Sequence, residues 1–329
     1  MGMKEILEEI DKDIADVVGT NFIHNLTSIV PNLEDVGLTY ERGQEKKGKL
    51  INTCVLFVDI RNSVALTEKH HTQTMGRIYT AFTKAVLKVA RYHGGHTRNI
   101  IGDRVMIVFP CENCCTNAVD CAISINHIAK NIINKKIVGI DFKCGIGIDL
   151  GELRVIKVGI QRRGTEKGEN KGLVWVGKPA NIVSRLTDNA NKTFKETLYK
   201  VERYPFNPFR FPQLLHSIYG LGALKQPNTS PYSPIKQSVI MSSEEFAKEV
   251  TINSSGKFDM LGGKFISFKR NEITYDYPSI LITEAVYKGL KKDNATRNDI
   301  LGGLWKEQKH NIKDVSGKIY GSNLNWKVS

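Results

Sequence analysis

The order of strand and helix patterns between residues 50 and 190 constrains the fold of this chain most strongly. A near-continuous apolar run, CVLFVDI at residues 54–60, is typical of a buried strand. Apolar residues then recur every three to four positions over residues 74–95 and stop at a Gly-Gly pair. That spacing predicts a helix with a C-terminal stop signal.

A tight hairpin is expected after this helix. In NIIGDRVMIVF, residues 99–109, Gly-Asp separates two apolar runs, as in a two-residue β-turn. A helix pattern at 114–132, strand patterns at 141–151 and 172–177, and a helix starting at KPANIVSRL follow. The order strand, helix, strand, strand, helix, strand predicts an α+β fold with a ferredoxin-like core.

Shifts in composition divide the chain into four parts. Residues 1–48 combine an acidic helix pattern with a lead-in loop, and residues 49–190 hold the core. Residues 191–275 include YPFNPFRFPQLLHS and QPNTSPYSPIK, which are rich in Pro, Ser and aromatic residues, so we expect a loop-rich insertion. The end of the core is expected over residues 276–329, where PSILITEAVYKGL reads as a strand and a helix.

The charge and hydropathy of the chain limit its partners and its location. With 47 basic and 34 acidic residues, the net charge of +13 favours polyanionic partners such as nucleotide phosphates, nucleic acid or anionic lipid. No apolar run is long enough to span a bilayer, and the acidic N-terminus does not read as a secretory signal. We expect a cytoplasmic protein that binds neither membrane nor nucleic acid.

Four of the six cysteines, Cys111, Cys114, Cys115 and Cys121, lie close together in the sequence. No second Cys or His pair follows at zinc-finger spacing. Cys114 and Cys121 instead share a helical period with apolar residues, so the prediction is buried structural thiols.

Two carboxylates follow buried strands in a way that suggests a metal site. Asp59 ends the apolar run CVLFVDI, and Asp103 stands at the tip of the hairpin. Either residue alone could be an ordinary turn or cap. On neighbouring strands of a ferredoxin-like sheet, the two carboxylates and the carbonyl of Ile60 would be hard oxygen ligands for Mg²⁺ or Mn²⁺.

A helix face offers a second polar pair. In VGKPANIVSRL, Asn181 and Arg185 stand at i and i+4 and therefore share one face. An amide beside a guanidinium can bind a phosphoryl group and a sugar together. A solvated helix face is the alternative that spacing alone leaves open.

These motifs together resemble the class III nucleotidyl cyclases. FVDIRNS, GGHTRNIIGDRVMIVF and VGKPANIVSRL occur in that family's order and at similar intervals. The resemblance implies a cyclase catalytic domain in which Asp59, Ile60 and Asp103 hold two divalent ions, Mn²⁺ or Mg²⁺. It implies that Asn181 and Arg185 stabilise the transition state of the reaction that forms a 3′,5′-cyclic monophosphate and pyrophosphate.

The same resemblance implies further contacts and an assembly. The segment after the metal strand would cradle the phosphates through Arg61, Asn62 and Ser63, and DVSGKIYG resembles a late segment in which Lys318 would bind phosphate. In this family one subunit supplies the metal ligands and the other supplies the Asn and Arg. Because this chain carries both sets, the implied assembly is a homodimer with shared active sites.

The positions that read the base depart from both purine enzymes of the family. Adenylate and guanylate cyclases carry Lys or Glu where this chain has Asn99, and Asp or Cys where it has Val174. An amide can pair with either edge of a pyrimidine. The pattern resembles the pyrimidine cyclases of bacterial Pycsar anti-phage systems, which implies a phosphorus–oxygen lyase whose product is read by a separate cyclic-nucleotide effector.

We predict UTP as the preferred substrate and cyclic UMP as the product. Tyr40 and Arg42, in LTYERG, are candidate base contacts that could close over the smaller ring. Cytidylate cyclase and a divergent adenylate cyclase remain alternatives within the family. A degenerate cyclase fold that serves as a regulatory module is the non-enzymatic alternative, and the net charge motivates a nucleic-acid-binding protein as a third class.

Overall fold

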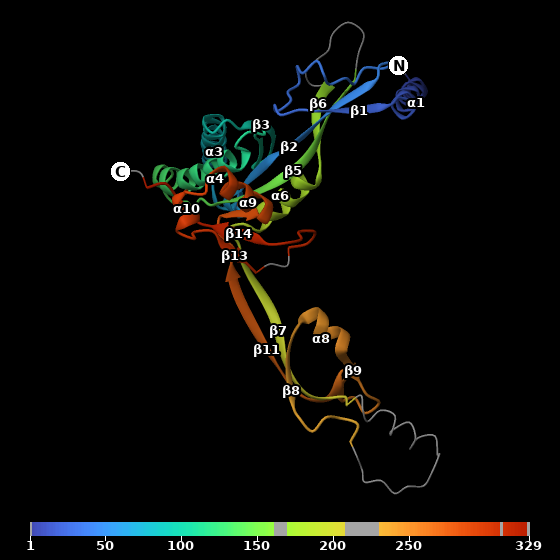
Figure 1. Ribbon diagram of the computed structural model, residues 1–329, viewed down its shortest axis with the longest axis vertical. Helices are drawn as coiled ribbons and strands as arrows, with labels where there is room; N and C mark the ends of the chain where they lie inside the picture. The colour runs from blue at the N-terminus through green and yellow to red at the C-terminus, as the bar shows by residue number, and fades with distance from the viewer. Residues whose placement is uncertain (1, 161–169, 208–229, 310–311, 328–329) are drawn as a thin grey trace. The chain divides into compact units, whose positions relative to one another are not determined.

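The computed structural model describes residues 2–160, 170–207, 230–309 and 312–327. The chain divides into two units, one formed by Met1–Lys192 and Tyr277–Ser329 and the other by Thr193–Asp276 (Figure 1). The second unit covers nearly the same residues as the insertion expected at residues 191–275.

The core of the first unit has the predicted alternation of strands and helices. In chain order it consists of β2 (Lys46–Ile60), α2 (Ser63–Lys69), α3 (Thr72–Tyr92), β3 (His96–Ile101), β4 (Arg104–Val108), α4 (Cys114–Ile128), the π-helical turn η1 (Ala129–Ile133), α5 (Asn134–Lys136) and β5 (Cys144–Gly159). The four strands lie in the order β5-β2-β4-β3. This is the ferredoxin-like arrangement, so the predicted fold class is confirmed.

The remaining elements of this unit extend the same sheet or cover it. They are α1 (Met3–Gly19), β1 (Phe22–Leu26), β6 (Lys171–Val176), α6 (Lys178–Asn189), β12 (Ile280–Thr283), α9 (Glu284–Asp293), α10 (Asn298–Leu301), β13 (Lys306–Gln308) and β14 (Ile319–Ser322). β12 pairs with β5 and with β14, so the chain re-enters the sheet after the insertion. In the described part of the chain, no helix is both long and apolar enough to cross a membrane.

The sheet is buried on both faces, and this explains the continuous apolar run of β2. Leu56, Val58 and Ile60 share one parity and face the cluster formed with α3, α4 and α9. Val55 faces a second cluster that includes Val183 of α6. Figure 1 shows α3 and α4 on one side of β2 and β5, with α6 on the other. Asp59 has the parity of Val55, so its side chain lies on the α6 face.

The second unit corrects the expectation of a loop-rich insertion. Its five-stranded sheet has the order β8-β7-β11-β10-β9. The elements are β7 (Thr193–Pro205), β8 (Gln237–Ser242), α8 (Ser243–Glu249), β9 (Val250–Ile252), β10 (Phe258–Met260) and β11 (Gly263–Asp276). The segment contains Pro- and Ser-rich stretches, but β7 and β11 pair with each other over nearly their whole length. Much of the Pro-rich sequence, residues 208–229, lies outside the described residues.

Helix α1 confirms the N-terminal helix pattern and has no buried side chain. Its large exposed apolar residues are Met3, Ile6, Leu7, Ile10, Ile14, Val17 and Val18. Five of them alternate at spacings of four and three, which is the heptad pattern of a coiled-coil seam. This apolar stripe of α1 is available to a partner.

Candidate active site

Asp59 lies next to the end of β2, directly opposite Arg104 of β4. Its Oδ2 accepts a hydrogen bond from Arg104 Nη2 at 2.9 Å and lies 3.7 Å from Arg61 Nη1. Burial alone would lower the pKa of Arg104, but its hydrogen bonds to Asp59 and Asp188 raise it overall. The carboxylate is therefore oriented from one side by a guanidinium that stays charged.

The other oxygen of Asp59 is free for a ligand. Oδ1 is buried and has no hydrogen-bond partner among the described residues. A buried acceptor without a partner is costly, and a cation removes that cost. A carboxylate oxygen is also the hard donor that Mg²⁺ and Mn²⁺ prefer, so this residue fits the divalent ions that the family uses.

Asp103 stands where the sequence predicted it, in the two-residue turn that joins β3 and β4. Ile101 pairs with Arg104, which leaves Gly102 and Asp103 as the turn. Gly102 has φ of 61°, a conformation that glycine adopts without steric cost. Because Arg104 lies opposite Asp59, the turn places the half-buried Asp103 beside the end of β2, next to Ile60.

Arg61 does not have the free guanidinium that a phosphate ligand needs. Its side chain is buried and donates to the carbonyls of Thr187 and Ala190 at the C-terminal end of α6. Its amide donates to the Lys143 carbonyl at 2.8 Å. Arg61 therefore joins α6 to the end of β2, and we leave it out of the proposed phosphate-binding set.

Asn62 and Ser63 lie at the start of α2, immediately after the metal strand. Asn62 has left-handed backbone geometry, with φ of 56°, and Ser63 is the first residue of the helix. The first amides of a helix have no acceptor within it, so this turn keeps donors that can face an anion. Asn62 and Ser63 remain candidates for phosphate contact.

Asn181 and Arg185 share an exposed face of α6, as their spacing predicted. Both line a cavity of about 570 Å³ together with Lys178, Ile182, Ser184 and Asp314. Arg185 Nη2 lies 3.6 Å from Asp314 Oδ2 across a solvent-exposed gap, where an ion pair contributes little. The guanidinium can therefore exchange this partner for a phosphoryl oxygen.

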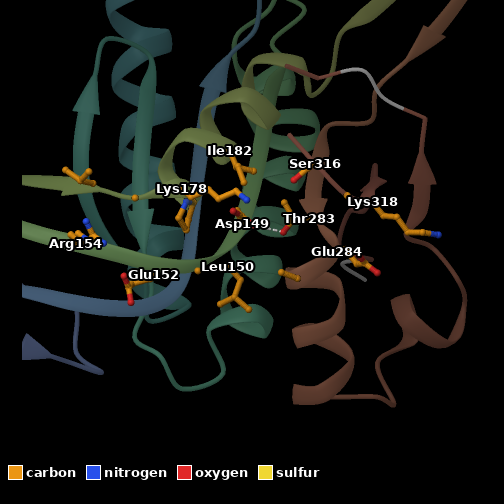
Figure 2. Close-up of a pocket in the computed structure, with 16 residues that line it drawn as sticks. Asp149, Leu150, Glu152, Arg154, Lys178, Ile182, Thr283, Glu284, Ser316 and Lys318 are labelled. Carbon is orange, nitrogen blue, oxygen red and sulfur yellow. Dashed lines mark hydrogen bonds between the residues drawn. The ribbon is translucent and has the colours of Figure 1, made fainter. Parts of the chain in front are cut away.

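Lys178 also lines a second cavity of about 640 Å³, shown in Figure 2. At its base Asp149 is buried and accepts a hydrogen bond from the Thr283 hydroxyl at 2.6 Å. Burial raises the pKa of Asp149, although Thr283, an amide and Lys178 oppose the shift. Figure 2 shows Lys178 beside Asp149, and Lys178 lines both cavities.

Lys318 lines the second cavity, but its ammonium points away from Asp149 (Figure 2). It lies 2.7 Å from Glu307 Oε2, and this hydrogen bond raises the pKa of Lys318. Both side chains of the pair are half exposed. The predicted phosphate contact would require Lys318 to leave Glu307.

Asn99 is exposed on the edge strand β3. It pairs with Met106 of β4, whose side chain belongs to the cluster on the α6 face. Residues directly opposite each other in a sheet share a face, so Asn99 lies on the same face as Asp59 and Arg104. Among the predicted base contacts, Asn99 is thus the one on the metal-bearing face of the hairpin.

Tyr40, Arg42 and Val174 are not brought together with Asp59 in one chain. Thr39 donates to the Lys47 carbonyl at the start of β2, roughly 40 Å along the strand from Asp59 at about 3.3 Å per residue. Tyr40 contacts Lys157 of β5, and Arg42 lies 3.9 Å from Asp13 of α1.

Val174 pairs with Ile156, at the same far end of the sheet. Its side chain is exposed, whereas Leu173 and Trp175 point into the cluster on the opposite face. Trp175 therefore turns away from Val174.

Sequence reasoning missed two cations. Arg104 follows Asp103 directly, and Lys178 lies in VGKPANIVSRL, the motif that contains Asn181 and Arg185. Both cations are therefore close in sequence to predicted site residues. Their roles depend on partners distant in sequence: Arg104 contacts Asp59 and Asp188, and Lys178 lies between two cavities.

The chain is similar to known cyclases in sequence. The profile of the adenylate and guanylate cyclase catalytic domain matches residues 46–192. The uridylate cyclase of Burkholderia cepacia is 33% identical over 176 residues, which cover 52% of this chain and 72% of that protein. The uridylate cyclase of Xanthomonas perforans is 28% identical over 209 residues, covering 61% of this chain and 84% of that one.

Solved structures of adenylyl cyclases are similar to the chain in part. The adenylyl cyclase CyaB from P. aeruginosa matches 83% of this chain and 94% of its own length, with 14% identity and a TM-score of 0.45. A bacterial light-regulated adenylyl cyclase matches 43% of this chain, which spans 40% of that protein, with 18% identity and a TM-score of 0.37. By its matched domain and its curated relatives, this chain belongs to the class III nucleotidyl cyclases and is a nucleotide cyclase.

Proposed function

We propose that this enzyme converts UTP to 3′,5′-cyclic UMP and pyrophosphate by two-metal catalysis. One observation carries the choice of base: a chain whose relatives are named uridylate cyclases has Asn99 and Val174 where the purine enzymes carry their base-reading residues. Asn99 is exposed on the face of the sheet that bears Asp59, where an amide can donate to and accept from a uracil edge.

The metal ligands in this proposal are Asp59, Asp103 and the carbonyl of Ile60. The unpartnered Oδ1 of Asp59 is the donor that supports it most directly. Two bound divalent ions would lower the pKa of the ribose 3′-hydroxyl and neutralise triphosphate charge. Arg104 holds the other oxygen of Asp59 and so fixes the direction in which the carboxylate offers its free one.

Asn181 and Arg185 would act on the reacting phosphoryl group. Their common cavity is open to solvent, and the pairing of Arg185 with Asp314 is weak enough to be replaced. A guanidinium can bind two phosphoryl oxygens through its planar fork as charge develops on them. Lys178, at the wall of the same cavity, would add a point charge for the outer phosphates.

We further propose that the active form is a homodimer in which each site takes Asp59 and Asp103 from one chain and Asn181 and Arg185 from the other. The far-end position of Val174 and Tyr40 supports this, since they cannot reach a base held near Asp59 of the same chain. The apolar stripe of α1 offers a second copy a seam to pair with.

The resemblance to Pycsar cyclases supports a role in anti-phage defence, with cyclic UMP as a messenger for a separate effector protein. A cytoplasmic location suits that role. All six cysteines are free thiols, which is the state that a reducing compartment maintains.

A turnover assay with equal concentrations of UTP, CTP, ATP and GTP and with Mn²⁺ tests the substrate. We expect cyclic UMP to form fastest. Faster turnover of CTP or ATP would contradict UTP as the preferred substrate, but the chain would still be a cyclase. No product from any triphosphate would indicate a regulatory module. Asn99→Ala should reduce the preference for pyrimidines, because a hydrogen-bonding site that loses its partner loses selectivity. Asn52→Ala, an exposed residue on β2, is the matched control.

A further inference from the structure

Three cysteine thiols meet inside the first unit, away from the proposed active site. Cys54 comes from β2, and Cys114 and Cys115 are the first two residues of α4. Their sulfur atoms all lie within 4.8 Å of one another, and all three residues are buried. The Cys54 and Cys115 sulfurs are 3.6 Å apart. The sequence placed Cys114 and Cys115 together but gave no sign that Cys54 joins them.

We propose that Cys54, Cys114 and Cys115 form a binding site for one Cu(I) ion. Thiolate sulfur is a soft donor that selects soft cations such as Cu(I) over Mg²⁺ and Mn²⁺. Three sulfurs around a central ion at about 2.3 Å would lie about 4 Å from one another, which is close to the spacing already present. The cluster therefore needs little movement to close around an ion.

The number of ligands favours Cu(I) over zinc. Within the described residues, no His, Asp, Glu or further Cys joins the three thiols. Structural zinc is almost always bound by four ligands, and catalytic zinc completes three protein ligands with a water. All three thiols belong to the buried hydrophobic cluster of the first unit, which also includes Ala118 and Val119. A soft ion that accepts three sulfurs fits this site better.

The position of the cluster also suits a thiolate ligand. Cys114 is the first residue of α4, and the N-terminal end of a helix favours the negative charge of a thiolate.

This site is chemically and spatially separate from the proposed Mg²⁺ or Mn²⁺ site. Cys54 faces α4 in the cluster on one side of the sheet, whereas Asp59, on the same strand, faces α6 on the other. A bound ion would link β2 to α4 and stabilise their packing. The thiol donors on the α4 face of β2 are soft, and the carboxylate on the α6 face is hard. Cu(I) and the divalent ions would therefore bind at different sites on β2.

Anaerobic titration of the purified full-length chain with Cu(I), in competition with a colorimetric Cu(I) chelator, tests the proposal. We expect one ion per chain, a sulfur-to-copper charge-transfer band in the ultraviolet, and three sulfur neighbours by X-ray absorption. Cys54→Ala, Cys114→Ala and Cys115→Ala should each weaken binding by more than ~100-fold, because even outer partners of a metal ligand contribute 10–100-fold.

Cys121→Ala is the matched control, since Cys121 is equally buried on α4 but lies outside the cluster. It should retain full Cu(I) binding. No binding by the wild-type chain, or unchanged binding by Cys114→Ala, would overturn the proposal. So would fewer than three sulfur neighbours in the wild-type spectrum, a measurement that does not depend on the variants folding.

Discussion

Asp59 presents its two carboxylate oxygens to different surroundings: Oδ2 accepts a hydrogen bond from Arg104 Nη2 at 2.9 Å, and Oδ1 accepts none from the described residues. Arg104 also pairs with Asp188 of α6, so the guanidinium is held from two sides. An oriented carboxylate with one unused, buried oxygen is what a cation-binding position requires. The proposed catalytic chemistry rests on this oxygen.

Replacing the unused oxygen should remove metal-dependent turnover. Asp59→Asn keeps the size of the side chain but loses the negative charge, so we expect kcat to fall by at least ~10²–10³, comparable to the loss of one preorganised transition-state contact. Initial rates measured against Mn²⁺ concentration check this. Asp103→Asn should behave alike, and the exposed Asp141→Asn should not. A near-normal Asp103→Asn enzyme would make Asp103 an ordinary turn residue.

Arg61→Met should affect stability and leave triphosphate affinity unchanged. The substitution leaves the carbonyls of Thr187 and Ala190 without their donor, and two buried acceptors at ~1–3 kcal/mol each give a destabilisation of about 2–6 kcal/mol. Urea denaturation measures this loss, and KM for UTP under folded conditions should stay within about twofold. A large rise in KM with unchanged stability would instead indicate that Arg61 binds the triphosphate. Arg270→Met, at an exposed ion pair of the second unit, is the control.

Local sequence patterns were sufficient to predict the positions that depend on neighbours in the chain. The Gly-Asp turn placed Asp103 at a hairpin tip, and the i and i+4 spacing placed Asn181 and Arg185 on one face of α6. The apolar run before Asp59 predicted a buried strand, and the structure has one there. Each of these features follows from a period or a turn preference that a few consecutive residues determine.

Features that depend on distant partners could not be predicted in this way. The guanidinium of Arg61 meets carbonyls more than a hundred positions later, so its sequence position beside Asp59 suggested a phosphate contact that the fold does not offer. Tyr40 is separated from Asp59 by the length of β2, which only strand pairing reveals. The insertion formed a sheet because β7 and β11 pair with each other, although the sequence between them contains Pro- and Ser-rich stretches.

Two inactive variants should restore activity to each other if the sites are shared. Asp59→Ala removes a metal ligand, and Arg185→Ala removes a transition-state contact, so each homodimer should be inactive. In a mixed dimer one site takes both damaged residues and the other takes neither. We expect turnover to recover toward one intact site per mixed dimer after the chains are co-refolded or co-expressed. A mixture as inactive as its parents would show that each chain builds its own site.

The apolar stripe of α1 should contribute to the stability of the dimer. Leu7→Glu with Ile14→Glu places two charges on positions that are more than half exposed in the single chain, so the fold itself should tolerate them. We expect the dissociation constant of the dimer, measured by sedimentation, to rise at least ~10-fold. Each buried leucine-sized side chain contributes ~1.5–3 kcal/mol to the free energy of association. Activity should then fall on dilution. Glu8→Gln with Asp11→Asn, off the stripe, should leave dissociation unchanged; equal dissociation for both variants would exclude the stripe from the interface.

Asp149 should make the fold less stable at neutral pH than an uncharged residue would. Burial raises its pKa above the ordinary value of 3.8, so the folded chain holds this proton where the unfolded chain has released it. Its contribution to stability is therefore complete below pH 3.8 and is lost as the pH rises through the folded pKa. Asp149→Asn keeps an oxygen that can accept from Thr283 and removes the charge. We expect this variant to have a higher free energy of unfolding than the wild type at pH 7, with the difference shrinking toward pH 4 in urea titrations.

Asp299→Asn is the control of opposite sign: burial would raise the pKa of Asp299, but hydrogen bonds from Arg297 and Trp305 lower it overall. That variant should be less stable than the wild type at pH 7, and the loss should shrink as the pH falls.

The opposite result for Asp149→Asn would contradict the prediction. If this variant is less stable than the wild type at pH 7, Lys178 stabilises the ionised Asp149 carboxylate by more than burial destabilises it.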